Sequence, residues 1–318
     1  MKRLGFDLGG TNMVAGLVDD DGRVLSKLSC PTRARRSEDA IATDMANLVL
    51  SLLDQNSLST SDISFFGLAS PGIANPDTGI IEYANNLPFE NFAVADFMRQ
   101  KTGIQNILIG NDANAAALGE AVCGQAKGTK NSVLITLGTG VGGGIILDGK
   151  IHTGINHSAG ELGHIVIHHG GRKCTCGRRG CWETYSSAVG LIEMTREKMR
   201  ERTDSAMWRL CDGDAKRLSG KTAFVAARLG DEAAQEVVGE YVEYLACGLT
   251  NIINIFQPEV LSIGGGVSGE GDYLLEPVRR IVDFEQYSSS CPVKTRLCIA
   301  TAGNDAGLIG AAFFESGV

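Results

Sequence analysis

Two segments of the chain follow one short pattern, and this repeat constrains the fold more than any other feature. Residues 4–22 and 132–149 each read as a strand, a turn with Gly and Thr, a second strand and an Asp-Gly turn. Asp-Gly turns between apolar runs are the strongest short-range hairpin signal. The repeat therefore predicts two domains built on one plan. The two turns that interrupt the strands are Gly9-Gly10-Thr11 and Gly138-Thr139-Gly140.

Composition and charge exclude several classes of protein. Of the 318 residues, 41 are glycine, roughly 13% against an average near 7%, and they follow no collagen-like period. The net charge of −8 disfavours a nucleic-acid or anionic-membrane surface. No apolar run reaches the roughly 20 residues of a membrane span, and the N-terminus does not read as a signal peptide. We expect a cytoplasmic enzyme.

Helical and strand patterns alternate along the chain, which indicates the α/β class. We expect an N-terminal domain over residues 1–115, completed by a C-terminal helix within 305–318, and a second domain over 116–304. Helices are predicted near 113–123, 186–203, 231–256 and 306–314, and strands near 65–69, 107–109 and 260–263.

Both glycine turns are suited to phosphate. In a turn without bulky side chains, successive backbone N–H groups converge on an anion, and Thr11 adds a hydroxyl donor. Asp7, two residues before the first turn, suits a Mg²⁺ that it would reach through water. One such turn can be an ordinary hairpin, but two, with Gly264-Gly265-Gly266 after an apolar strand, favour a nucleotide held between two domains. Neither the P-loop pattern nor the Rossmann fingerprint is present.

The pair Asn111-Asp112 falls between a predicted strand and a predicted helix. An Asp at this position is commonly a helix cap. It can also be a catalytic base, because the helix dipole holds its carboxylate ionised. The residues alone leave both roles open.

A segment rich in His and Cys predicts a zinc site. His164, Cys174, Cys176 and Cys181 supply four ligands of the type that close a tetrahedral Zn²⁺. Buried thiols without a metal are the alternative, which the crowding of three cysteines into eight residues disfavours. A structural zinc here would fix the loop that carries Glu161 and Glu183.

Taken together, these motifs resemble the ROK family of sugar kinases, over essentially the whole chain. The resemblance implies an α/β fold of two ribonuclease-H-like domains, of the actin and hexokinase type, with an interdomain cleft that closes on ATP and a hexose. Within the family, the stretch from Trp182 to Ser187 is most similar to bacterial glucokinases. The matching motifs are Asp7–Thr11, Asn86-Leu87, Asn111–Ala116, Leu137–Gly144, Glu161–His164 and Cys174–Glu183.

The resemblance also implies roles. Asp112 would be the base for the sugar 6-hydroxyl, and His164 would bind both sugar and structural Zn²⁺. The other sugar ligands would be Asn86, Asn111, Glu161 and Glu183. ATP with Mg²⁺ would be bound by Asp7, Gly9, Gly10, Thr11, Asn12, Gly138, Thr139, Gly140, Gly264, Gly265 and Gly266.

Three functions compete. Phosphorylation of glucose to glucose 6-phosphate is favoured, and kinases of N-acetylmannosamine or N-acetylglucosamine are the alternative, because residues 155–161 depart from the glucokinase pattern near the sugar C2. The third is a sugar-sensing repressor, which would need a DNA-binding domain before the first strand, where three residues precede Leu4. As partners we expect the hexose and ATP, no nucleic acid and no membrane, with assembly as a homodimer or homotetramer.

Overall fold

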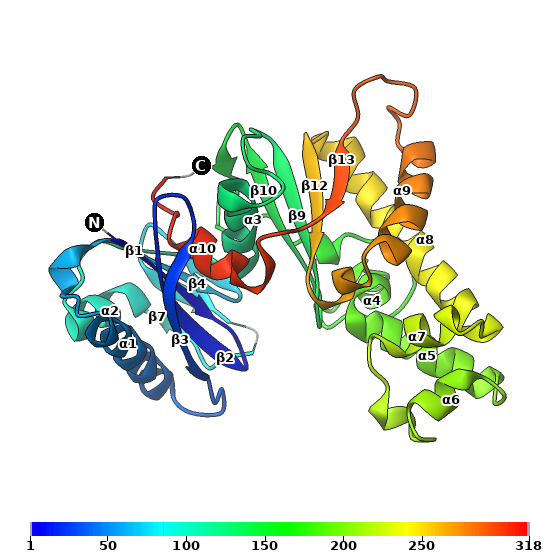
Figure 1. Cartoon of the computed structure of the whole chain (residues 1–318), viewed down its shortest axis with the longest axis horizontal. Coiled ribbons are helices and arrows are strands. Elements are labelled where there is room, and N and C mark those ends of the chain that lie inside the picture. Colours follow the sequence, from blue (N-terminus) through cyan, green and yellow to red (C-terminus); the bar gives the residue numbers. More distant parts are fainter. Residues whose placement is uncertain (1, 85, 317–318) are drawn as a thin grey trace. The chain divides into compact units, whose positions relative to one another are not determined.

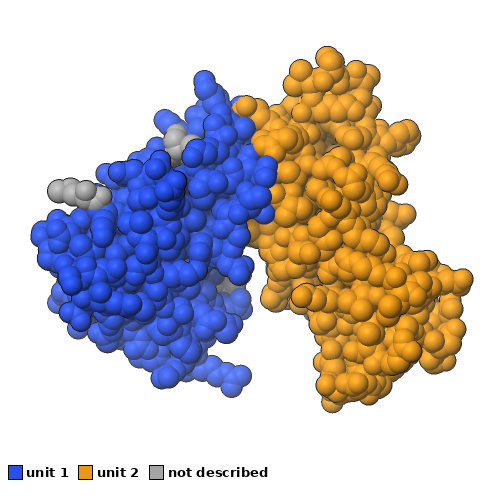
Figure 2. Space-filling model, in the orientation of Figure 1, with its two compact units in different colours: residues 1–134, 144–160, 300–318 blue, residues 135–143, 161–299 orange. Residues whose placement is uncertain are grey.

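The computed structural model describes residues 2–84 and 86–316. The chain forms two compact units, coloured separately in Figure 2. Unit 1 consists of residues 1–134, 144–160 and 300–318, and unit 2 of residues 135–143 and 161–299. These units assign 116–134 and 144–160 to the N-terminal part, whereas the division made from the sequence placed them in the second domain. That division stays a prediction.

A mixed five-stranded sheet organises unit 1. Its strand order is β3-β2-β1-β4-β8, with β1, β2 and β3 antiparallel and with β4 and β8 parallel to β1. In the register of the sheet, Asp7 of β1 pairs with Ala69 of β4, which pairs with Gly110 of β8. The carboxyl ends of these three strands therefore lie at one edge. The strands are β1 (Lys2–Leu8), β2 (Asn12–Val18), β3 (Val24–Pro31), β4 (Ile63–Ser70) and β8 (Ile107–Asn111); β5 (Ile73–Asn75), β6 (Ile80–Tyr83) and β7 (Glu90–Phe92) form a small separate sheet.

Helices cover both faces of this sheet (Figure 1). Successive residues of a strand face opposite sides of the sheet. Leu4 and Phe6 of β1 therefore point to the same face, where they pack in an apolar core with residues of α1 and α2. On the other face α10 approaches so closely that a Cβ on Gly67 would lie 1.7 Å from the Ala311 carbonyl oxygen. The absence of a side chain at Gly67 thus lets α10 pack directly against the backbone of the sheet, as part of unit 1. The helices are α1 (Glu38–Gln55), α2 (Val94–Thr102), α3 (Asp112–Cys123), α10 (Ala306–Ala311) and the short η1 (Thr60–Asp62) and η5 (Gly303–Asp305).

The second five-stranded sheet has the order β11-β10-β9-β12-β13, and long helices dominate unit 2 (Figure 1). The predicted helices near 186–203 and 231–256 are confirmed as α5 and α8, whereas α10 ends at Ala311, earlier than predicted, and Phe314 folds over Gly110 instead. The strands are β9 (Ser132–Leu137), β10 (Val141–Leu147), β11 (Lys150–Ile151), β12 (Val260–Gly264) and β13 (Arg296–Ile299). The helices are η2 (Leu162–His164), α4 (Glu183–Ser186), α5 (Ala188–Glu201), α6 (Ala206–Leu210), η3 (Ala215–Arg217), α7 (Thr222–Arg228), α8 (Glu232–Phe256), η4 (Gly266–Glu270) and α9 (Asp272–Glu285). The part of the chain that the structure describes contains no helix with the length and apolarity of a membrane span.

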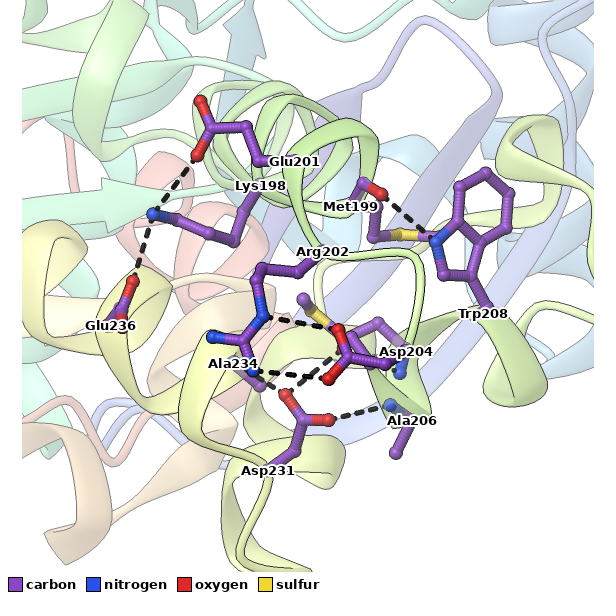
Figure 3. A network of polar contacts seen from close by, with 12 residues as sticks. Lys198, Met199, Glu201, Arg202, Asp204, Ala206, Trp208, Asp231, Ala234 and Glu236 are labelled. Carbon is purple, nitrogen blue, oxygen red and sulfur yellow. Dashed lines mark hydrogen bonds and ion pairs between the residues drawn. The ribbon is translucent and has the colours of Figure 1, made fainter.

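A polar network joins the start of α8 to α5 and α6 (Figure 3). Asp231 caps α8 by accepting from the Ala234 N–H at 2.8 Å, and it also accepts from the Ala206 N–H at 2.6 Å. Burial of Asp231 opposes its ionisation, but these donors and the Ser205 hydroxyl outweigh it and hold the pKa of the carboxyl below its usual value. One carboxylate therefore fixes the entry of α8 and the first turn of α6 together.

Candidate functional site

The first glycine turn, between β1 and β2, is fixed by two hydrogen bonds from the buried Thr32. The Thr32 N–H donates to the Thr11 carbonyl at 2.8 Å, and its hydroxyl donates to the Gly9 carbonyl at 2.6 Å. The Gly9 N–H closes the turn on the Asn12 carbonyl at 3.0 Å. Gly10 and Thr11 stay exposed. The turn is thus fixed in one shape with its outer face open to a ligand.

Asp7 lies just before this turn, on the face of the sheet that α10 covers. A Cβ on Gly307 would lie 3.1 Å from its Oδ2, so the missing side chain of Gly307 makes room for the carboxylate. Burial, and then the charges of Asp112 and Asp305, raise the pKa of Asp7 to about 6. Asp305 is itself paired with the Lys27 Nζ at 2.6 Å. Asp7 thus lies close enough to two other carboxylates, one of them paired with a lysine, for their charges to raise its pKa.

Asn111 and Asp112 form the junction of β8 and α3. The Asn111 Oδ1 accepts from the backbone N–H groups of Ala113 and Asn114, at 2.9 and 3.2 Å, and its Nδ2 donates to the Gly72 carbonyl at 3.0 Å. Asn111 is therefore the helix cap, a role that the sequence left open for Asp112. Asp112 occupies the first turn of α3, where its Oδ1 also accepts from the Ala113 N–H at 2.8 Å.

Asn86 lies beside the first turn, where a Cβ on Gly10 would be 3.6 Å from the Asn86 Cβ. Its side chain is exposed. Unit 1 therefore gathers one group of the predicted site residues near the carboxyl edge of its sheet. They are Asp7, Gly9, Gly10, Thr11, Asn12, Asn86, Asn111 and Asp112.

The second glycine turn, in unit 2, is fastened by a carboxylate. The Val141 N–H donates to Glu183 Oε2 at 3.0 Å, and a Cβ on Gly140 would lie only 2.3 Å from that oxygen. Any side chain at position 140 would displace Glu183. The Ala188 N–H donates to the Gly138 carbonyl at 2.9 Å. Glu183, predicted as a sugar ligand, thus holds the turn with one oxygen.

The Gly264–Gly266 turn lies against the end of β9, next to the second glycine turn. Gly265 has φ +86°, which favours glycine, and a Cβ there would lie 2.5 Å from the Leu137 carbonyl oxygen. A Cβ on Gly266 would meet no atom within 4 Å. The two glycine-rich turns predicted to bind nucleotide are therefore neighbours in unit 2.

The four predicted metal ligands converge. One donor atom from each of His164, Cys174, Cys176 and Cys181 lies within 4.8 Å of the other three. The Cys174 Sγ is 3.6 Å from the His164 Nδ1, and the Cys176 Sγ is 3.6 Å from the Cys181 Sγ. A tetrahedral zinc ion with Zn–S bonds of about 2.3 Å and a Zn–N bond of about 2.0 Å separates two sulfurs by about 3.8 Å, and a sulfur and a nitrogen by about 3.5 Å. The donor set fits Zn²⁺.

The loop with these ligands is anchored on both sides. A Cβ on Gly163 would lie 2.3 Å from the Val141 carbonyl oxygen, so the Glu161–His164 turn packs against the second glycine turn. Trp182 is fully buried and donates from Nε1 to the Tyr244 carbonyl at 2.9 Å. Glu161 itself is exposed. Unit 2 therefore gathers the other predicted residues, which are Gly138, Thr139, Gly140, Glu161, His164, Glu183 and Gly264–Gly266 with the three cysteines.

Several residues that support the site were missed from the sequence. Thr32 supports the first turn, and Tyr185 accepts from the Arg172 N–H at 2.7 Å beneath the metal loop, with the Arg172 guanidinium 5.3 Å from its ring. Gly307 makes room for Asp7. Thr32 and Gly307 stand in no recognisable motif, and Tyr185, although it lies in the Trp182–Ser187 stretch, was assigned no role from the sequence. Each acts through a partner that the fold brings to it.

Comparison with known proteins identifies the family. The sequence model of the ROK family matches residues 3–316. The chain belongs to the ROK family. This ROK protein is similar to a glucokinase of Halalkalibacterium halodurans, with 39% identity over 96% of this chain and 92% of that protein. It is also similar to an N-acetylmannosamine kinase of Salmonella typhi, with 30% identity over 100% and 99% of the two chains.

A solved structure agrees with this assignment. A ROK family glucokinase from Streptomyces griseus, in complex with glucose and AMPPNP, has a TM-score of 0.83, 31% sequence identity and 98% coverage of both chains. The predicted membership of the ROK family is confirmed. The predicted α/β fold of actin and hexokinase type is confirmed as well.

Proposed function

We propose that this ROK protein transfers the terminal phosphoryl group of ATP to the 6-hydroxyl of glucose. One observation carries the proposal: Asp112 and Asp7 lie at the same sheet edge as an open glycine turn, in a chain similar to glucokinases over almost its whole length. Phosphoryl transfer to a hydroxyl requires a site for the phosphate donor, which the glycine turn with Asp7 would supply, and a base for the acceptor hydroxyl, which Asp112 would supply.

Asp112 is the catalytic base in this proposal. Phosphoryl transfer passes through a loose transition state, so the protein has to position the reactants and stabilise charge more than form bonds. The 6-hydroxyl loses its proton late, and a carboxylate is then a sufficient acceptor. Asn111, as the cap of α3, fixes the first helical turn in which Asp112 lies.

The glycine turns hold the nucleotide. Residues 9–12 of unit 1 and 138–140 of unit 2 supply backbone N–H groups to phosphate, and Gly264–Gly266 lie against the adenosine. A bound Mg²⁺ would neutralise phosphate charge. Asp7 fits the role of its water-mediated partner: burial, and then the charges of Asp112 and Asp305, raise its pKa to about 6, and a nearby cation would favour its ionised form.

Zinc has a structural role in the proposal. His164 and the three cysteines would hold it and cross-link the loop that carries Glu161 and Glu183. Since the His164 Nδ1 lies beside the Cys174 Sγ, Nε2 is the ring nitrogen that remains for the sugar. The metal site would then position a sugar ligand directly.

Sugar selectivity follows from hydrogen bonding. Asn86, Asn111, Glu161, His164 and Glu183 would pair with the ring hydroxyls. A site built to bond a hydroxyl strongly rejects an analogue that lacks it. The similarity to an N-acetylmannosamine kinase and the unusual residues 155–161 make that activity the second candidate.

A coupled assay of ADP release tests both candidates, with glucose, mannose, allose, N-acetylmannosamine and N-acetylglucosamine as acceptors. We expect kcat/KM for glucose to exceed that for either N-acetylhexosamine by about 10²-fold, the effect of one or two unpaired buried polar groups. Comparable turnover of N-acetylmannosamine would select the second candidate. No ADP release with any of these sugars would reject the kinase.

A further inference from the structure

Residues 152–160 of unit 1 form a loop that leads directly to Glu161. The Ala159 N–H donates to the Thr153 carbonyl at 2.9 Å and closes this loop on itself. Only Gly160 separates the closed loop from Glu161. Whatever fixes the loop therefore also restricts the backbone that enters Glu161.

His157 lies within the closed loop in an unusual conformation. Its φ is +59°, a left-handed backbone that is unfavourable for a residue with a side chain. Its side chain is only 16% exposed, and its Nε2 lies 3.4 Å from an Asp77 carboxylate oxygen. Its Nδ1 is enclosed and has no hydrogen-bond partner within the described part of the chain. Backbone outliers of this kind persist where surrounding contacts maintain them, and they concentrate at functional sites.

Asp77 lies in a turn that is itself well fixed, between β5 and β6. The Asn75 Oδ1 accepts from the N–H groups of Asp77 and Thr78, at 3.0 and 3.3 Å. The Asn75 carbonyl accepts from the Gly79 N–H at 2.9 Å. The contact with His157 thus joins the loop to a rigid turn of the same unit.

We propose that His157 and Asp77 are positioning residues for Glu161. Their contact, together with the closing bond of the loop, fixes the backbone as far as Gly160 before a sugar binds. The chain is held after Glu161 as well, because the His164 N–H donates to the Glu161 carbonyl at 3.0 Å. A loop or side chain that is ordered only on binding lowers affinity, and a Glu161 positioned in advance avoids this loss. The inference rests on the proposed function, in which Glu161 is a sugar ligand.

Steady-state kinetics on the full chain test the inference with His157→Asn and Asp77→Asn. Asn adopts a positive φ readily, so the first variant keeps the backbone shape and removes the imidazole. The second keeps the size of the side chain and removes its charge. We expect KM for the preferred sugar to rise by about twofold to tenfold in each variant, with kcat and KM for ATP unchanged. The double variant should show no larger rise than the more affected single variant, because both changes remove one contact.

Two further variants act as controls. Asp77→Glu restores a carboxylate at a position whose side chain is 82% exposed, and it should keep KM near the wild-type value. Asp96→Asn removes an exposed carboxylate that pairs with Arg99 at 2.7 Å in α2, and it should leave KM unchanged. Hydrogen exchange followed by mass spectrometry observes the loop without any assay of activity. Exchange of the amides of residues 152–160 should be faster in His157→Asn and Asp77→Asn than in wild type or Asp96→Asn.

The other outcomes overturn the inference. An unchanged sugar KM in both variants would refute the positioning of Glu161, and so would a lower kcat at unchanged KM. Exchange of the loop at the wild-type rate in both variants would show that the contact does not fix it. Additive rises of KM in the double variant would show that His157 and Asp77 act separately. Inactivity of wild type on every sugar would reject the proposed function, and calorimetric titration with glucose would then decide the inference, with an equal Kd for wild type and variants against it.

Discussion

Replacing Asp7 by Asn should stabilise the protein at neutral pH while abolishing its kinase activity. Burial and the neighbouring charges of Asp112 and Asp305 raise the pKa of Asp7 from 3.8 to about 6. At about 1.4 kcal/mol per pH unit, this difference means that the ionised carboxylate lowers the free energy of unfolding by about 3 kcal/mol above pH 6. An amide of the same size carries no such charge.

The sign of this effect depends on pH. Because the folded state binds the proton more tightly than the unfolded state, wild-type stability falls as the pH rises from about 4 to about 6. The advantage of Asp7→Asn should be about 3 kcal/mol near pH 7.5 and about 1 kcal/mol near pH 4.5. Urea unfolding at the two pH values measures it, with Asp21→Asn, in the exposed turn after β2, as the control for the loss of one charge. A variant no more stable than wild type near pH 7.5, or an advantage that does not shrink in acid, would refute the reasoning.

Three further predictions concern the base, the metal and the helical part of unit 2. Asp112→Asn should lower kcat by about 10²-fold or more with sugar binding largely retained, and near-normal kcat would exclude Asp112 as the base. Protein purified without added zinc should contain one Zn²⁺ per chain by metal analysis. The Cys176→Ser variant should lose this zinc, whereas Cys291→Ser, a change at an exposed cysteine outside the cluster, should retain it. Full activity of zinc-free protein would contradict the structural role of the metal. Asp231→Ala should lower the free energy of unfolding by about 1–2 kcal/mol at neutral pH, a difference that shrinks as the pH falls below about 4 through the lowered pKa of Asp231. Asp204→Ala, which removes an exposed ion pair with Arg202 (Figure 3), should change stability little, and an equal loss in both variants would refute the capping argument.

Much of the fold could be predicted because local patterns and tertiary packing agree. The apolar face of α1 has helical spacing, and Ser37, a residue type typical of caps, precedes it in the sequence and accepts from the Ala40 N–H in the structure. The cysteine spacing likewise predicted which four side chains the fold brings together as candidate ligands. Such features act within short stretches of chain, where spacing alone determines which residues meet.

Other features depend on contacts between distant segments, which spacing does not encode. The end of α10 was predicted at 314, but Phe314 leaves the helix to cover Gly110, two hundred residues earlier in the chain. The capping role of Asn111 was missed as well, because it depends on which of two adjacent polar residues has the extended backbone of a cap. Long-range register and the choice between neighbouring polar side chains require the folded structure.

Glu183 connects two of the proposed functions within unit 2. Its Oε2 accepts from the N–H that follows the second glycine turn, and the lack of a side chain at Gly140 lets it lie there. The same carboxylate is a proposed sugar ligand, so a sugar hydroxyl bonded to Glu183 would hold in place a group that already fixes a turn proposed to bind phosphate. Each hydrogen bond to this carboxylate is charge-assisted and is stronger where water is excluded. The arrangement gives a physical route by which a sugar bound as proposed would stabilise the turn that is proposed to bind nucleotide.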